Sequence, residues 1–73
     1  MLPNVERALD VLRDPTRRRV LRRLRDGTRS VREIADGMDV SRPAVSQHLK
    51  VLKAAGLVVV RAEGTRRLYA VDT

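Results

Sequence analysis

The stretch from Ser30 to Leu57 constrains the fold of this chain more than any other segment. Ser30 and Glu33 have the spacing of a capping box, which starts a short helix. Ser41, followed two residues later by a proline, marks the start of a second helix, and Gly56 marks its end. Two short helices joined by a tight turn are the layout of a helix-turn-helix, whose second helix enters the DNA major groove.

Two further helices are expected on the N-terminal side of this pair. Asn4 can cap the first of them, and Asp14 followed by Pro15 is a good start for the second, which Gly27 can end. Apolar residues recur at helical spacing in both segments. They are Val5, Ala8, Leu9 and Leu12 in the first helix, and Val20, Leu21 and Leu24 in the second. The first helix therefore carries one apolar stripe.

The last part of the chain has the pattern of strands. Leu57–Val60 is rich in β-branched residues, and Leu68–Val71 is a second strand-like run. The segment Glu63-Gly64-Thr65 between them is a turn signal, so the two runs predict a β-hairpin. Four helices followed by a hairpin give an α+β fold, a winged helix-turn-helix with the hairpin as its wing. The length of 73 residues allows a single domain, which we expect to span residues 1–73.

The charge balance narrows the choice of partner. The chain has 16 lysines and arginines against 9 acidic residues, a formal net charge of +7, and its lysines are Lys50 and Lys53. Arginine favours planar contact with phosphate or guanine, although a basic balance also fits an anionic membrane surface. With no apolar run long enough to span a bilayer and no signal peptide before the first helix, we expect a cytoplasmic protein. Tyr69 is the single aromatic residue, which argues against stacking on single-stranded bases.

The helix that begins after Ser41 has two different faces. If Val45, Leu49 and Leu52 are buried, four polar side chains point outward, namely Arg42, Ser46, Gln47 and Lys50. Arginine can pair with guanine and glutamine with adenine through two hydrogen bonds each, and a serine allows close approach. On an isolated amphipathic helix such residues form an ordinary solvated face. The hairpin that follows and the positive charge favour DNA instead.

Three runs of the sequence resemble a known family. DPTRRRVLRRL, SVREIADGMDVSRPAVSQHLKVLKAAGLV and EGTRRLYAV are similar to the ArsR/SmtB family of bacterial winged-helix repressors, over residues 9–71. The most specific run is VSRPAVSQHLKVLKAAGLV. The resemblance implies a homodimer that binds an imperfect inverted repeat and blocks transcription. It also implies that Arg42, Ser46, Gln47 and His48 lie at or near base edges, while the wing arginines reach phosphate or the minor groove.

The chain departs from the pattern of this family in two ways. Metal-sensing members have paired cysteines in the third helix, where this chain reads Glu33-Ile34-Ala35-Asp36 and has no cysteine. Other members carry His, Asp or Glu ligands on a C-terminal helix, and this chain ends at Thr73 before such a helix. We therefore expect no metal and no other cofactor. Since the C-terminal helix normally shares the dimer interface, we expect dimerisation chiefly through the N-terminal helix.

Two features allow more than one interpretation. His48, the single histidine, is either a partly buried packing residue or a DNA contact, and it lacks partners for a metal site. Six arginines of the second helix have two possible roles. They form either a solvated surface, on which their mutual repulsion would be less if some pair with aspartates, or phosphate contacts that flank the groove. They are Arg17, Arg18, Arg19, Arg22, Arg23 and Arg25. We expect no enzyme, because the carboxylates form no inward pair and the glycines no phosphate loop.

The predicted DNA interface has two parts. In and beside the recognition helix it comprises Ser41, Arg42, Pro43, Ser46, Gln47, His48, Lys50 and Lys53. In the wing it comprises Arg61, Thr65, Arg66 and Arg67. Arg42, Ser46 and Gln47 are expected to read bases, whereas the lysines and the wing arginines mostly hold phosphates. The alternative is a winged-helix module that binds another protein and has no specific DNA target.

Overall fold

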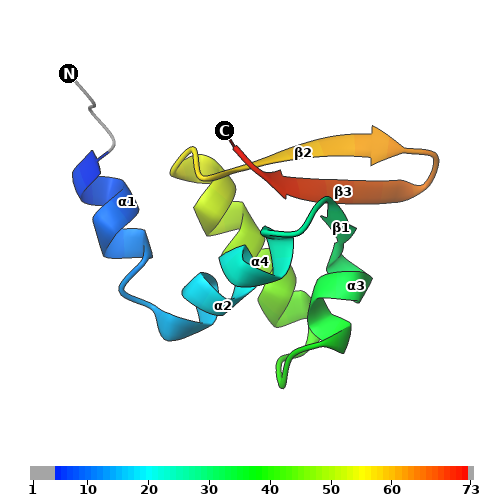
Figure 1. Cartoon of the computed structure of the whole chain (residues 1–73), viewed down its shortest axis with the longest axis horizontal. Helices are drawn as coiled ribbons and strands as arrows, with labels where there is room; N and C mark the ends of the chain where they lie inside the picture. The colour runs from blue at the N-terminus through cyan, green and yellow to red at the C-terminus, as the bar shows by residue number, and fades with distance from the viewer. Residues whose placement is uncertain (1–4, 73) are drawn as a thin grey trace.

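The structure is a computed structural model that describes residues 5–72. Four helices come first, with a two-residue strand among them, and two longer strands follow (Figure 1). In chain order they are α1 (Val5–Val11), α2 (Pro15–Leu24), β1 (Arg29–Ser30), α3 (Val31–Asp36), α4 (Arg42–Ala54), β2 (Val58–Glu63) and β3 (Arg66–Val71). The helices lie below the sheet in Figure 1, with α1 at one end of the molecule and the hairpin tip at the other. This arrangement confirms the predicted winged helix-turn-helix.

The helix-turn-helix begins and ends at the predicted signals. At the start of α3 the backbone N–H of Glu33 donates to Ser30 Oγ at 3.2 Å, and the backbone N–H of Ser30 donates to Glu33 Oε1 at 2.9 Å. At the start of α4 the N–H of Ala44 donates to Ser41 Oγ at 3.3 Å. Gly56 follows α4 with a φ of 77°, a conformation that glycine adopts without strain. These bonds occupy N–H groups that a helix start leaves unpaired.

Helix α2 also starts as predicted, since Asp14 Oδ1 accepts the backbone N–H of Thr16 at 2.8 Å and Pro15 is its first residue. It ends at Leu24, three positions before the predicted terminating glycine. The cap predicted at Asn4 lies outside the described residues. Among the residues that are described, no helix is both long and apolar enough to cross a bilayer.

The core lies between α2, α3, α4 and β2. Its largest fully buried side chains are Val20, Ile34, Val45, Leu49 and Leu52. Burying a side chain of this size stabilises a fold by about 1.5–3 kcal/mol relative to leaving it exposed. Because α4 contributes three of them, its orientation is fixed and its opposite side is left outside the core, as the sequence predicted.

The sheet has one strand more than predicted. Its order is β1-β3-β2, all antiparallel, and β1 pairs through Arg29 with Tyr69 and through Ser30 with Leu68. A two-residue strand is too short to show an alternating pattern, so the prediction of a two-stranded sheet was incomplete. Because β1 pairs with β3, α3, which follows β1 directly, is attached to the wing strand β3.

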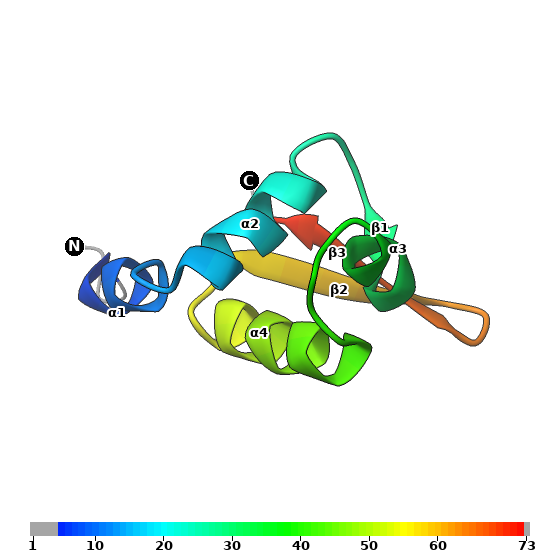
Figure 2. The same cartoon turned by 90° about the horizontal axis from the view of Figure 1, so that it is seen from below.

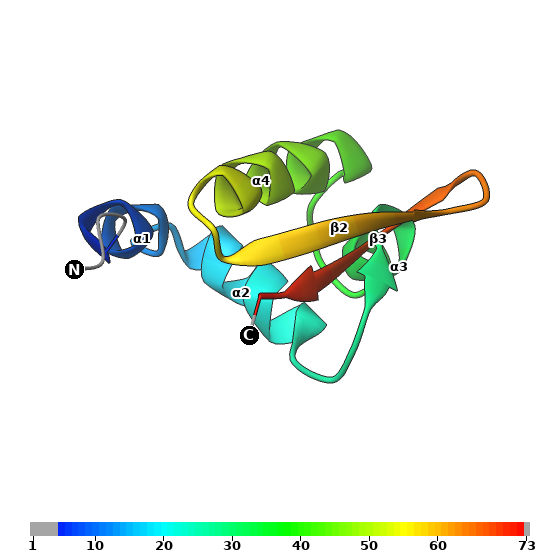
Figure 3. The ribbon, with the colours of Figure 1, turned by 90° about the horizontal axis from the view of Figure 1, so that it is seen from above.

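The hairpin strands are longer than the apolar runs that predicted them. Glu63 pairs with Arg66 in the ladder, and the turn between them contains Gly64 with a φ of 63°. The predicted strands ended where the apolar residues end. Backbone hydrogen bonds do not need apolar side chains, so the ladder continues outward as a polar ribbon, which Figures 1–3 show projecting from the body.

The apolar stripe predicted for the first helix meets the core only at its end, where Leu12 packs against it. Val5 and Leu9 are 44% and 62% exposed, while the buried residue of α1 is Val11, near the helix end. Figures 2 and 3 show why, because α1 lies beyond the other helices, at the end of the molecule opposite the hairpin tip. Two large apolar side chains are therefore left on the surface of this helix.

Candidate nucleic-acid interface

The side of α4 that faces away from the core is open to solvent. Figures 2 and 3 show α4 along one outer side of the molecule, next to the sheet. Every residue predicted for the recognition part is exposed except His48, which is half-buried. Arg42 and Gln47 in particular are not covered by the chain. The helix thus presents a convex row of hydrogen-bonding side chains, a shape that fits the major groove.

The start of α4 favours an anion. Arg42 is its first residue and Pro43 its second, so a guanidinium stands beside the positive end of the helix dipole. Pro43 fixes the backbone angle there and has no N–H to satisfy. Ser41 uses its oxygen to cap the helix, which leaves its hydroxyl hydrogen to donate outward.

His48 is half-buried on α4, and its charge acts on Asp14, the residue that caps α2. Partial desolvation raises the pKa of Asp14, but the backbone N–H groups of Thr16 and Arg17 and the charges of His48 and Arg17 outweigh it and leave that pKa below its ordinary value. This position favours the packing interpretation of His48. Within residues 5–72, no group of three His, Cys, Asp or Glu residues is close enough together to hold a metal ion.

All four predicted wing residues are exposed, yet their charges are not equivalent. Arg66 lies 2.9 Å from a carboxylate oxygen of Glu33, and Arg61 lies 3.4 Å from one of Glu63. Arg67 forms no ion pair with any of the described residues. Arg67 is therefore the wing arginine whose charge is least compensated by the chain itself.

The arginines of α2 follow neither interpretation completely. No member of the group forms an ion pair with an aspartate in the part of the chain that the structure describes, although the charge of Arg17 acts on Asp14. Instead, Arg18 donates to the carbonyl oxygen of Leu12 at 2.6 Å, and Arg23 donates to that of Glu33 at 2.9 Å. Arg17 Nη1 also donates to a backbone carbonyl, at 3.4 Å. Three of the six arginines thus hold neighbouring segments together.

The sequence analysis missed two residues beside the interface. Arg32 is exposed on α3, and Glu33 was recognised as a helix cap but not as a partner of the wing. The capping box itself was visible in the sequence. The contact with Arg66 depends on the short strand β1, for which the sequence carries no signal.

An exposed polar face on α4, a buried core behind it and a basic hairpin beside it define a winged helix-turn-helix domain of the nucleic-acid-binding type. Residues 12–61 match a family model described as a helix-turn-helix domain. Together with its relatives, this match shows that the chain belongs to the ArsR/SmtB family.

Two of the relatives from Mycobacterium tuberculosis cover most of this chain. An HTH-type transcriptional regulator is 55% identical over 67 residues, which are 92% of this chain and 63% of the relative. The HTH-type transcriptional repressor SmtB is 44% identical over 61 residues, which are 84% of this chain and 45% of the relative. The chain therefore spans about half to two thirds of the length of these relatives. Their names agree with the prediction that the chain is not an enzyme.

A solved structure from Mycobacterium bovis is similar over nearly the whole chain. It is described as the homodimeric winged helix-turn-helix DNA-binding domain of a possible ArsR-family transcriptional regulator. It is 35% identical with a TM-score of 0.91, and the match covers 99% of this chain and 67% of that one. The fold and the family are thus supported by both sequence and structure.

Proposed function

We propose that this chain is the DNA-binding unit of a cytoplasmic transcriptional regulator, a repressor that binds duplex DNA as a homodimer and blocks access to a promoter. The observation that carries the proposal is the outer face of α4. Its polar residues are exposed while Val45, Leu49 and Leu52 on the opposite side are fully buried. The regulator and repressor names of the relatives support the same function.

The residues divide by the chemistry that they offer. Arg42, Ser46 and Gln47 lie on the exposed part of α4 nearest its start and would read base edges. The remaining cationic residues would hold the backbone through phosphate contacts. They are Lys50 and Lys53 on α4 and Arg61, Arg66 and Arg67 in the wing. His48 is half-buried, so it would approach DNA only at the edge of the contact.

The exposed apolar side chains of α1 support a dimer. Val5 and Leu9 stand on the surface of a helix with few other burial partners, and a second copy of α1 would cover them. The homodimeric domain from M. bovis supports this assembly. A two-fold dimer would place two α4 helices about one DNA turn apart, which is the geometry that reads an imperfect inverted repeat.

The test of DNA reading begins with a duplex selected from a random pool. Fluorescence anisotropy at near-physiological salt is expected to show tighter binding to that duplex than to a scrambled one. Arg42→Ala and Gln47→Ala are each expected to cost about 1–3 kcal/mol on the selected duplex and to relax sequence preference. Arg25→Ala, at the exposed residue that follows α2, is the matched control with little expected effect. Equal affinity for both duplexes would contradict the proposal.

The dimer is tested separately by sedimentation of the protein with and without the selected duplex. We expect a dimer and a stoichiometry of two chains per inverted repeat. Leu9→Glu is expected to shift the free protein toward monomer, because it places a charge in the apolar contact. Glu6→Gln, an exposed polar change on the same helix, is the control. An unchanged dimer in the Leu9 variant would exclude α1 as the interface.

A further inference from the structure

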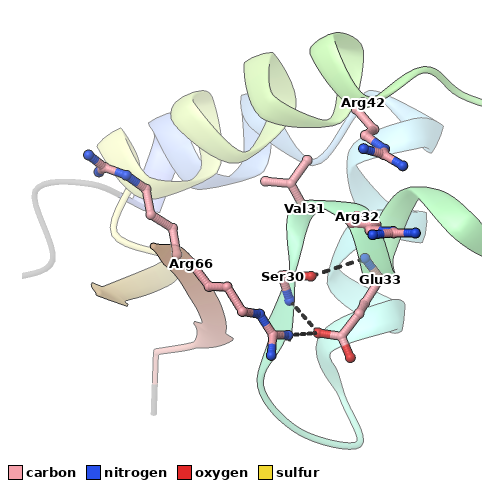
Figure 4. A pocket seen from close by; sticks show the side chains of 7 residues that line it. Ser30, Val31, Arg32, Glu33, Arg42 and Arg66 are labelled. Carbon is pink, nitrogen blue, oxygen red and sulfur yellow. Dashed lines mark hydrogen bonds and ion pairs between the residues drawn. The ribbon is translucent and has the colours of Figure 1, made fainter. Parts of the chain in front are cut away.

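A cavity of about 600 Å³ lies between α3, the start of α4 and the strand β3. Figure 4 shows Arg32 from α3, Arg42 from α4 and Arg66 from β3 arranged around Val31. The full lining is Ser30, Val31, Arg32, Glu33, Arg42, Arg66 and Arg67. Because three separate elements supply the charged side chains, the cavity exists only in the folded wing and helix-turn-helix together.

The lining has an excess of positive charge. The lining contains four arginines and one carboxylate, that of Glu33, and the sole ion pair among these described residues joins Glu33 to Arg66. Arg32, Arg42 and Arg67 have no acidic partner within the described part of the chain. Guanidinium groups gathered in this way repel one another unless an anion lies between them. Their planar donors match the oxygens of a phosphate.

The carboxylate of Glu33 accepts two hydrogen bonds, and one of them is exchanged for another partner more easily than the other. Its Oε1 atom accepts the backbone N–H of Ser30 and Nη2 of Arg66, both at 2.9 Å (Figure 4). The bond to Ser30 is part of the capping box that begins α3. The pair with Arg66 is solvent-accessible, because the two side chains are 44% and 54% exposed. An ion pair that is this exposed is weak and can be exchanged for another anion.

We propose that this cavity binds the phosphodiester backbone of one DNA strand, and that a DNA phosphate replaces Glu33 as the partner of Arg66. Arg32 completes the phosphate contact, while Arg42 at the start of α4 remains at the base edges. Glu33 stays in place through Ser30 and acts as a competing anion, which weakens binding to any duplex that is not also held by α4. The inference rests on the proposed function and adds to it one phosphate contact, Arg32, and one residue that restrains non-specific binding.

The competition is tested with Glu33→Gln. A glutamine keeps the capping box, since its carbonyl oxygen still accepts the N–H of Ser30, but it removes the negative charge. On a scrambled duplex we expect tighter binding and a plot of log affinity against log salt that is steeper by about 0.9 for each bound chain. Asp36→Asn, which removes a charge from the exposed end of the same helix, is the control with an unchanged slope. A wild-type or shallower slope in the Glu33 variant would overturn the exchange.

The phosphate contact is tested with Arg32→Ala. We expect its salt plot to be shallower by about 0.9 for each bound chain, so that between 50 and 200 mM salt it loses on the order of threefold less affinity per bound chain than the wild type. Its preference for the selected over the scrambled duplex should not change. Arg22→Ala, an exposed arginine on α2, is the control. An unchanged slope with preference intact refutes this inference alone, whereas no preference in the wild type refutes the proposed function.

Discussion

Gly37→Ala is expected to destabilise the protein through a side chain from another helix. The backbone at Gly37, just after α3, has a φ of −96°, which alanine adopts freely. A Cβ at this position would overlap the guanidinium of Arg23, which reaches across from α2. The arginine must then move, and its bond to the carbonyl oxygen of Glu33 is lost.

The magnitude follows from two opposing effects. Arg23 is half-buried and its bond to the Glu33 carbonyl is 2.9 Å long, and such a bond from a charged donor contributes about 1.5–3 kcal/mol. Replacing a glycine where alanine fits the backbone stabilises by about 0.4–1 kcal/mol, because the unfolded chain loses freedom. The net expectation for Gly37→Ala is therefore a loss of about 0.5–2.6 kcal/mol of unfolding free energy.

The assay is urea unfolding followed by circular dichroism, at one fixed protein concentration because a dimer couples stability to concentration. A double-mutant cycle with Arg23→Ala isolates the clash. In the Arg23→Ala background, Gly37→Ala is expected to stabilise by about 0.4–1 kcal/mol, since no guanidinium remains in the way. An equal effect of the glycine substitution in both backgrounds would refute the reasoning.

Three further predictions concern the core, acid and metals. Leu49→Ala truncates a side chain that is 0% exposed and should lower the free energy of unfolding by about 2–5 kcal/mol, enough to unfold a small domain. Lys50→Ala, the control, should leave the circular dichroism spectrum unchanged. Hydrogen bonds from Ser30 and the charge of Arg66 lower the pKa of Glu33, and the pKa of Asp14 is lowered as well. The stabilisation from these two carboxylates is complete above their ordinary pKa values, 4.5 for Glu33 and 3.8 for Asp14, and it is lost as the pH falls through the lowered pKa values. A melting temperature that stays constant down to about pH 2 would contradict this prediction. Zn(II) or As(III) should leave DNA affinity in the anisotropy assay unchanged, and a clear loss would reveal a metal site.

The features that the sequence predicted correctly are local ones. The capping box of Ser30 and Glu33 and the caps at Asp14 and Ser41 depend on residues no more than three apart. The buried face of α4 follows from helical spacing alone. Because the residues opposite a buried helix face lie outside the core, the exposure of Gln47 and its neighbours could be predicted without a structure.

The features that the sequence did not predict depend on contacts between distant segments. Strand β1 exists because Ser30 meets Leu68, and this pairing brings Arg66 to Glu33. Arg23 resembles a solvated arginine in the sequence, and its bond to α3 appears only when the two helices are packed. The stripe on α1 was visible, but its direction depends on where the helix lies relative to the core.

The central claim, that the outer face of α4 meets DNA, is tested most directly by backbone amide chemical shifts. The selected duplex is titrated into isotopically labelled protein, and shift changes are mapped onto the structure. We expect the largest changes at Ser46, Gln47 and Lys50 and along the wing, with small changes at Arg22 on α2 and at Arg25 just after it. Large changes confined to α2, with Ser46 and Gln47 unaffected, would contradict the account.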